Sequence, residues 1–512
     1  MLYQKQLNQL LSASNEDSLT LGLEILKGLD VSAYQDFVDD YQQLYHFFFV
    51  LEDPHSAITP QQMAQLNTSE IIVTNPSQKE GRVPESISRL THLKKLQLGN
   101  FHSLTLPKNL SELEYLEALT ITHSPLTDTE LPLFKNLKSL VLTGNELFEF
   151  PEEVTQLHSL ETLEIAFNSL ATLSSNINQL QNLSFLIVRK TQLIELPPEI
   201  AFLDKLQALK LADNQLQMIP DEFHLLQNLK KIELNRNQLQ ELPHCFFQLP
   251  CLTHLNLSEN RLTMLSPKIG EAVKLTFLDL SHNKLSMLPP EIGNLDRLKV
   301  FRVWQNQLNS VPAELFQMHC LEQLDLSGNR LSYLYENIAL LQNLKTLDLS
   351  NNQFATLPKG IGTLKKLSDL DVSKNQLMVI FPEIGQLEQL VQLDLSDNEL
   401  TQFPLEIGQL ANLEDLHCER NPLWGLPSVI GQLGALSTLS LNDCQLTSLP
   451  PEMGQLTQLR ELYLNNNHLT HLPQEMAQLQ QLQRLELTGN AFSDAVQAEI
   501  EQWFPNCQEL YF

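Results

Sequence analysis

Three His–Cys dipeptides are the residues of this sequence whose types could bind a metal ion or supply a nucleophile. They are His244–Cys245, His319–Cys320 and His417–Cys418. Imidazole nitrogens and thiolate sulfurs are common zinc ligands, and a thiolate beside an imidazole is a frequent nucleophilic pair in enzymes. Each dipeptide stands at a different phase of the repeat described below, so the three are not expected to meet around one ion. We therefore predict no metal site, no cofactor and no catalytic residue.

The sequence motifs of several large enzyme classes are absent as well. No GxxxxGK[ST] loop, no HExxH pair, no GxSxG elbow and no set of protein-kinase motifs occurs. These motifs place nucleophiles, metal ligands or phosphate-binding backbone groups at fixed spacings, which the chain does not offer. We expect a protein without enzymatic activity, and an enzyme with an unrecognised site remains an alternative.

The charge balance of the 512 residues is strongly acidic, with 61 Asp and Glu against 33 Lys and Arg and a net charge of −28. Nucleic acids and anionic lipid surfaces attract Lys and Arg, so this surface disfavours both as partners. The N-terminus lacks the apolar core of a secretory signal, and no apolar stretch is long enough to insert into a membrane. The six scattered Cys follow no disulfide framework. We expect a cytoplasmic location.

The pattern LxxLxLxxNxL recurs with a period of 23 residues along most of the chain. We call the position of its Asn the Asn slot. Of eighteen slots, fourteen hold Asn, and the others hold Phe101, Ser124, Thr191 and Cys444. Only the step from Ser124 to Asn145 departs from the period, at 21 residues, so a local break in curvature is expected there. The predicted Asn ladder comprises Asn145, Asn168, Asn214, Asn237, Asn260, Asn283, Asn306, Asn329, Asn352, Asn375, Asn398, Asn421, Asn467 and Asn490.

Each repeat predicts a short strand followed by a turn. In LDLSNNQF, residues 347–354, the alternation of Leu347 and Leu349 places both leucines on one face of a strand and Asp348 on the other. Asn352 then ends the strand, and its amide can donate to and accept from backbone groups of the turn. One repeat cannot cover its own leucines, so stacked repeats are predicted to share a core.

The unit resembles the leucine-rich repeat, and segments such as LPPEIGNLDRL, residues 288–298, are similar to intracellular proteins of the Ras-suppressor type and to plant intracellular Ras-group relatives. The resemblance covers roughly residues 82–512. It implies an α/β solenoid, a curved leucine-rich repeat horseshoe with a parallel concave sheet. It also implies a protein partner, and the relatives suggest a small Ras-like GTPase or a signalling complex.

The two ends of the chain are predicted to cover the core that terminal repeats would otherwise expose. The apolar residues of the N-terminal part recur at helical spacing over residues 16–29 and 33–51. A docking or dimerisation element is a second interpretation of this part, because the Phe triplet 47–49 is too apolar to remain exposed. The predicted parts are residues 1–70, a helical N-terminal cap or small helical domain; 71–92, a degenerate first repeat and connector; 93–492, a solenoid of about eighteen repeats; and 493–512, a C-terminal cap helix with Ser493 as its N-cap.

Function is expected on the outward strand positions, which stand six, four and two residues before each Asn slot. The segment FRVWQNQL, residues 301–308, carries Arg302 and Trp304 where neighbouring repeats carry Asp and Ser. Trp and Arg are enriched in binding hot spots, so we interpret this as a contact patch. Drift and mutual stacking of Arg302 with Trp304 are the alternatives. The predicted partner-binding residues are Phe185, Ile187, Arg189, Lys210, Lys231, Phe277, Arg302, Trp304, Asp325, Asp348, Asp371 and Asp394.

The outward Asp residues after Trp304 have two interpretations. They form a solvated stripe, or their summed field attracts a basic partner. The leading hypothesis for function is a non-enzymatic scaffold that recognises a protein through the concave sheet, in intracellular signalling. A bacterial effector-type or host-interacting repeat module is the alternative.

Overall fold

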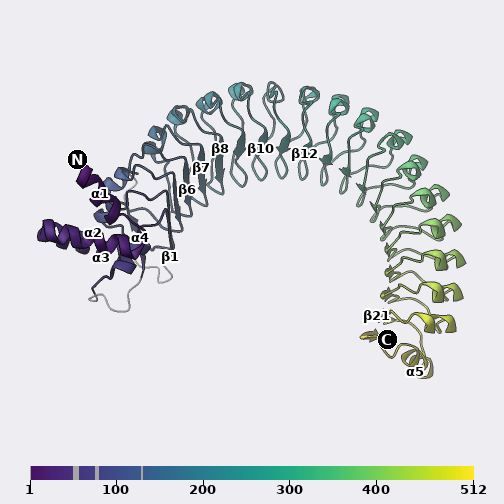
Figure 1. The fold of residues 1–512 in the computed structure, drawn as a ribbon. Coiled ribbons are helices and arrows are strands. Elements are labelled where there is room, and N and C mark those ends of the chain that lie inside the picture. Colours follow the sequence, from purple (N-terminus) through teal and green to yellow (C-terminus); the bar gives the residue numbers. More distant parts are fainter. Residues whose placement is uncertain (1, 50–56, 75–79, 128–130) are drawn as a thin grey trace. The chain divides into compact units, whose positions relative to one another are not determined.

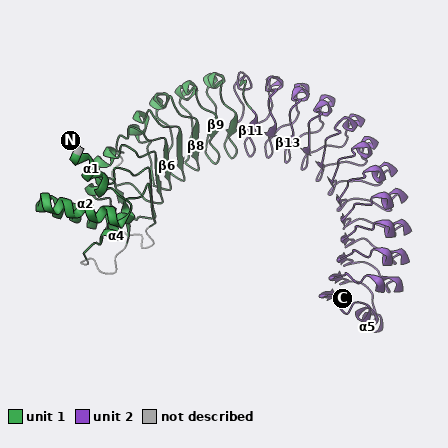
Figure 2. Cartoon of the chain, viewed as in Figure 1, with its two compact units in different colours: residues 1–239, 249–252 green, residues 240–248, 253–512 purple. Residues whose placement is uncertain are grey.

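The computed structural model describes residues 2–49, 57–74, 80–127 and 131–512, which form two compact units. Unit 1 comprises residues 1–239 and 249–252, and unit 2 comprises residues 240–248 and 253–512 (Figure 2). In each unit, repeats coil side by side, with parallel strands along the inner side of the curve and short 3-10 helices along the outer side (Figure 1). The predicted α/β solenoid with a parallel concave sheet is confirmed.

Unit 1 begins with four α-helices and continues with strands and 3-10 helices (η). The α-helices are α1 Leu2–Leu11, α2 Glu16–Leu29, α3 Val31–Phe48 and α4 Pro60–Leu66. The strands are β1 Glu70–Thr74, β2 Gly81–Arg82, β3 Lys95–Gly99, β4 Leu104–Thr105, β5 Ala118–Thr122, β6 Ser139–Thr143, β7 Thr162–Ala166, β8 Phe185–Arg189, β9 Ala208–Lys210 and β10 Lys231–Glu233. The 3-10 helices are η1 Glu85–Arg89, η2 Lys108–Glu112, η3 Glu152–Gln156, η4 Ser175–Gln179, η5 Pro198–Phe202 and η6 Asp221–Leu225.

Unit 2 repeats the same alternation and ends with one α-helix and one strand. Its strands are β11 His254–Asn256, β12 Phe277–Asp279, β13 Val300–Arg302, β14 Gln323–Asp325, β15 Thr346–Asp348, β16 Asp369–Asp371, β17 Gln392–Asp394, β18 Asp415–His417, β19 Thr438–Ser440, β20 Glu461–Tyr463, β21 Arg484–Glu486 and β22 Glu509–Tyr511. Its helices are η7 Pro267–Glu271, η8 Pro290–Asn294, η9 Ala313–Gln317, η10 Glu336–Leu340, η11 Lys359–Thr363, η12 Pro382–Gln386, η13 Leu405–Gln409, η14 Ser428–Gln432, η15 Pro451–Gln455, η16 Gln474–Gln478 and α5 Asp494–Trp503.

Neighbouring strands pair in parallel, with equivalent positions of consecutive repeats opposite each other. Leu324 of β14 lies opposite Leu347 of β15, and Asp325 lies opposite Asp348. The inward leucines are almost completely buried, whereas the aspartates are half-buried on the other face. The two-residue alternation of a strand therefore divides each repeat between the core and the concave surface.

The Asn side chains join consecutive repeats through backbone hydrogen bonds. The Nδ2 of Asn352 donates to the carbonyl of Leu326 in the preceding repeat at 3.0 Å and to those of Leu349 and Ser350 in its own. Its Oδ1 accepts from the backbone N–H of Leu331 at 2.9 Å. One amide thus bonds four backbone groups, and because Leu326 and Leu349 also accept from the neighbouring Asn329 and Asn375, the ladder is continuous from repeat to repeat.

The outer side of each repeat packs closely because its 3-10 helix carries few bulky side chains. In η8, Ile292 is buried, and a Cβ built on Gly293 would lie 2.3 Å from the carbonyl oxygen of Glu314. Proline at the first position of η8 suits a helix start, because its ring fixes φ near the helical value. The PEIG sequence therefore sets the distance between neighbouring repeats on the outer side.

The helices at the start of the chain pack on the first repeats of unit 1. The ring of Phe47 stacks on that of Phe101, 5.7 Å between centroids, and the side chain of Arg89 in η1 forms an ion pair with Asp40 of α3 at 2.9 Å. Asn67 accepts a hydrogen bond from the buried hydroxyl of Tyr41 at 2.6 Å. These contacts give Phe47 a packing role at the start of the repeats.

The last residues of the chain add a helix and a final strand to unit 2. Strand β22 pairs with β21, and Ile500 of α5 is buried. Ser493 occupies the N-cap position of α5, as predicted, and its side chain makes no capping hydrogen bond.

The short repeat between Ser124 and Asn145 keeps its place in the sheet of unit 1. Strands β5 and β6 pair over five residues, in the same parallel register as their neighbours. In this repeat, residues 128–130 lie outside the described part of the chain, and the rest of the return segment contains no 3-10 helix. The missing two residues are therefore accommodated away from the strands.

Candidate functional site

The repeat with the segment FRVW places its side chains as the strand alternation requires. Phe301 and Val303 are fully buried, whereas Arg302 and Trp304 are half-buried on the concave surface of unit 2. Trp304 stands two residues after the end of strand β13, where the turn to the next segment begins. The fold thus requires the inward pair and leaves the outward pair free for recognition.

Aromatic and basic side chains from three adjacent strands form a stacked row, which we call the aromatic–basic patch. The rings of His254 and Phe277 stack with centroids 4.1 Å apart and an interplanar angle of 9°. The guanidinium carbon of Arg302 lies 5.7 Å from the centroid of Phe277. The Trp304 ring lies edge-on against His282 at 4.1 Å. The alternative of an Arg302–Trp304 stack is wrong, because each side chain stacks on a residue of the preceding repeat.

A hollow of 440 Å³ opens beside Trp304 along the ends of the following strands. Besides Trp304, its wall carries Ser327, Asp371, Asp394 and Arg420, with neighbouring turn residues. Residues that precede the Asn slot, such as Gln305 with a φ of 51°, adopt left-handed backbone conformations in this wall. The hollow therefore continues the patch with a largely polar, acidic surface.

The outward aspartates of β14 to β17 lie side by side, with Asp325, Asp348, Asp371 and Asp394 in register. Each Oδ1 accepts a hydrogen bond from the backbone N–H two residues later, at 2.8–3.0 Å. A second hollow of 260 Å³ lies over this row and is also lined by His417.

Burial and mutual repulsion raise the pKa of three of these carboxyl groups. Partial burial is the largest cause that raises the pKa of Asp325 and Asp348, and it raises the pKa of Asp371 to about 6. The neighbouring carboxylates Asp348 and Asp394 add to the effect on Asp371. The row is thus an electrostatically strained surface, on which a cationic group would relieve repulsion.

The five predicted contact residues of unit 1 lie on β8, β9 and β10. Phe185 is 44% exposed, and Ile187 is half-buried. Two of the cations are partly neutralised, because Arg189 pairs with Glu164 at 3.5 Å and Lys231 pairs with Glu233 at 2.8 Å. The outward residues of unit 1 therefore offer less uncompensated charge than those of unit 2.

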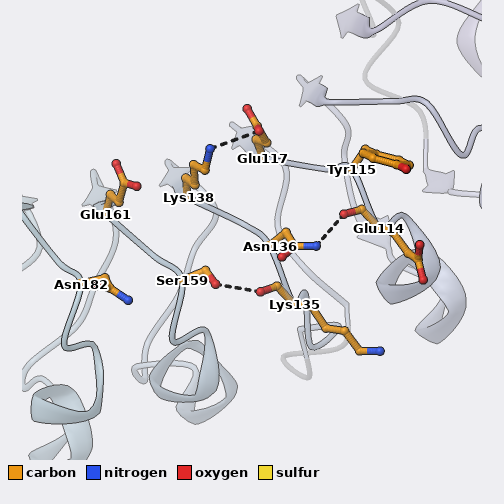
Figure 3. Close-up of a pocket in the computed structure, with 9 residues that line it drawn as sticks. All are labelled: Glu114, Tyr115, Glu117, Lys135, Asn136, Lys138, Ser159, Glu161 and Asn182. Carbon is orange, nitrogen blue, oxygen red and sulfur yellow. Dashed lines mark hydrogen bonds and ion pairs between the residues drawn. The ribbon is translucent and has the colours of Figure 1, made fainter.

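Sequence reasoning missed a hollow of 640 Å³ in unit 1, at the segments that lead into strands β5 to β8 (Figure 3). Lys138 pairs with Glu117 at 3.1 Å, and Asn136 Nδ2 donates to the carbonyl of Glu114 at 2.8 Å. Ser159 Oγ donates to another carbonyl of the preceding repeat. These polar groups tie repeat to repeat, so their pairing favours a structural role.

The His–Cys dipeptides are the last candidate residues from the sequence, and the structure shows the environment of Cys418. Cys418 is fully buried, and burial raises the pKa of its thiol, so that it stays protonated. Within the described residues, no three His, Cys, Asp or Glu side chains gather in a way that could hold a metal ion. No helix in the same residues combines the length and hydropathy that a membrane crossing requires.

Family models match the repeats directly. The model described as leucine rich repeat matches residues 204–262, 273–331 and 435–492, and the one described as leucine-rich repeat region matches residues 324–421. A search of curated protein sequences found no match.

Solved structures give more extensive likenesses. A leucine-rich repeat protein of Leptospira interrogans is 38% identical over 74% of this chain and 95% of its own, with a TM-score of 0.69. The plant peptide hormone receptor RGFR1, solved with RGF2, is 26% identical over 83% of this chain and 79% of its own, with a TM-score of 0.61. The Arabidopsis receptor kinase HAESA, solved with the peptide hormone IDA and the co-receptor SERK1, is 27% identical over 82% and 73%, with a TM-score of 0.65.

Proposed function

Because the chain belongs to the leucine-rich repeat proteins, we propose that it is a non-enzymatic scaffold that binds a protein partner on the concave surface of unit 2. The contact begins at the aromatic–basic patch and extends over the aspartate row. Repeats of this kind form a rigid, open sheet that suits an extended contact better than a chemical reaction.

The observation that carries this proposal is the aromatic–basic patch, whose half-buried side chains keep part of their surface in solvent. Phe277, Arg302 and Trp304 project from a sheet whose core is already complete without them. Apolar surface in water lowers solubility, and Trp and Arg are the residue types most enriched at the centres of interfaces. The stacks on His254 and His282 hold these side chains in place before a partner arrives, which lowers the entropy cost of binding.

The acidic row beside the patch supports a partner with a basic segment. The likeness to two plant receptors, each solved with a peptide hormone, supports a partner whose basic segment binds in an extended form. The finer part of the proposal, taken from the resemblance of the repeats, is a cytoplasmic partner such as a small Ras-like GTPase or a signalling complex.

Affinity purification from the native cell tests the proposal. The wild-type chain is used as bait beside a Phe277→Ser/Arg302→Ser/Trp304→Ser variant and a control variant with Phe148→Ser and Trp424→Ser, exposed aromatic side chains that lie outside the strands of the proposed contact. A partner that wild type and control recover and the triple variant loses supports the proposal. Equal recovery by all three baits would contradict it.

A second candidate is a bacterial module that binds a host protein through the same surface. The observation that favours it is the 38% identity to a repeat protein of Leptospira interrogans. Repeating the purification with a host-cell lysate separates the candidates, because only this one predicts that the triple variant loses a host protein.

A further inference from the structure

A second surface of unit 2 combines cations with exposed apolar side chains, on the edge that follows the Asn slots. Arg261, Lys284 and Arg330 each stand one position after a slot and are exposed. Met264, Met287 and Tyr333 stand four positions after the same slots and are 66%, 66% and 61% exposed. We call these six residues the basic–apolar edge.

The cations of this edge have no use within the fold. Among the described residues, none of the three side chains makes an ion pair or a hydrogen bond, although the chain carries a net charge of −28 and other cations of unit 2, such as Lys268, Lys299 and Arg420, pair with carboxylates. At the same two positions, the repeat between those of Lys284 and Arg330 carries the neutral Gln307 and Ser310. The repeat after Tyr333 carries Gln353 and Thr356, so the basic–apolar edge ends there. Cations without ion pairs that lie beside exposed apolar side chains favour a partner whose surface is both acidic and apolar.

Helix α2 of the same chain has this chemistry on its outer face. Its buried face, with Leu19 and Leu23, packs inward. The opposite face exposes Asp17 and Glu24, which make no ion pair among the described residues, together with Leu21 at 50% and the half-buried Ile25 beside it. A helix face that mixes acids with apolar side chains is costly to leave in water and typical of a docking segment.

The spacings of the two surfaces agree. Asp17 and Glu24 are seven residues apart, about 10.5 Å along a helix, while Lys284 and Arg330 stand two strands apart, about 10 Å across a sheet. Leu21 and the half-buried Ile25 are about 6 Å apart along the helix axis, and Met264 and Met287 are about 5 Å apart on adjacent strands.

We propose that α2 of one molecule docks on the basic–apolar edge of a second copy. Asp17 and Glu24 face Lys284 and Arg330, while Leu21 and Ile25 cover Met264 and Met287, with Tyr333 at the border of the contact. The two surfaces are different patches, so the contact is heterologous, and a pair of molecules keeps one free helix and one free edge. Association therefore grows beyond a dimer with concentration.

Sedimentation of the full chain over roughly 5–500 µM tests this, a range that spans weak and transient interfaces. We expect the mean mass to rise with concentration above 58.4 kDa. A helix variant, Leu21→Ser/Glu24→Lys, and an edge variant, Met287→Ser/Lys284→Glu, should each weaken association at least tenfold. Val379→Ser removes an exposed apolar side chain from the same edge outside the row and should leave association unchanged.

A mixture of the two defective variants makes the test specific. The edge variant still has an intact α2, and the helix variant still has an intact edge, so together they should form a 1:1 dimer that cannot grow. Unchanged melting of each variant shows that the fold is intact. A chain that stays monomeric at all concentrations, an association that both variants retain, or a mixture that remains monomeric overturns the proposal.

Discussion

The guanidinium of Arg302 lies over the ring of Phe277, 5.7 Å from its centroid, on the concave side of two adjacent strands. A cation–π contact at an exposed site contributes about 0.5–1 kcal/mol, and more once a partner excludes water. The pair is therefore weak in the free protein and gains strength on binding. This is how we expect a recognition surface to differ from a core contact.

Replacing Trp304 by Ala should reduce affinity without unfolding the protein. Because the side chain is outward, we expect the free energy of unfolding to fall by less than about 1 kcal/mol and partner affinity to fall by about 2 kcal/mol or more. Phe301→Ala is the matched core variant, and its fully buried ring should cost about 3–5 kcal/mol of stability. Urea unfolding and calorimetric titration measure both quantities. Equal destabilisation by the two variants would show that Trp304 serves the fold.

The Asn ladder should be essential to stability. Asn352→Ala leaves four backbone groups without their side-chain partner, so we expect a loss of about 2–4 kcal/mol. Gln353→Ala, at the next and exposed position, should change stability by less than about 0.5 kcal/mol. Urea unfolding of the two variants provides the comparison. If both changes had similar effects, the amide would not be supporting the turn.

Ionisation of the aspartate row should make the protein less stable as pH rises. Folding raises the pKa of Asp371 from 3.8 to about 6, so the folded state is favoured while this carboxyl group is protonated. The resulting contribution to the free energy of unfolding is fully present below the unfolded pKa and is lost as pH rises through about 6. After allowance for solvent screening, we expect a fall of roughly 1–2 kcal/mol between pH 4 and 7. Asp371→Asn keeps an acceptor for Ser373 N–H and should flatten this part of the profile. Identical profiles for the two proteins would refute the assignment.

The outer side of the solenoid should not tolerate a side chain at Gly293. Because its Cβ would lie 2.3 Å from the Glu314 oxygen, Gly293→Ala forces the neighbouring 3-10 helix to move and should cost about 1–3 kcal/mol. Gly434→Ala is the control, since no heavy atom lies within 4 Å of the added carbon. Thermal unfolding distinguishes the two. A control as unstable as Gly293→Ala would place the cause in the backbone conformation of glycine.

The period of the repeat was sufficient to predict the division between core and surface. Once Leu324 and Leu347 face inward, Asp325 and Asp348 must face outward, because a strand alternates. The Asn slot and the strand register followed from the same periodicity. These features are local, and each is repeated often enough for the pattern to be unambiguous.

The sequence could not reveal which outward side chains contact one another. Arg302 stacks on Phe277, 25 positions earlier, and Trp304 on His282, 22 positions earlier, because adjacent parallel strands bring diagonal neighbours into contact with rotamers that no sequence pattern specifies. The pairing of Arg189 with Glu164 depends on the same cross-strand geometry. The hollow beside Trp304 arises from the turns after several strands, so it required coordinates.

The most direct test is the dissociation constant of the purified chain for the partner that wild type recovers, compared with the Phe277→Ser/Arg302→Ser/Trp304→Ser variant. We predict at least a thirtyfold weaker complex, about 2 kcal/mol, with an unchanged melting temperature. An unchanged dissociation constant for the triple variant would mean that the partner binds elsewhere and would contradict the assignment of the concave surface.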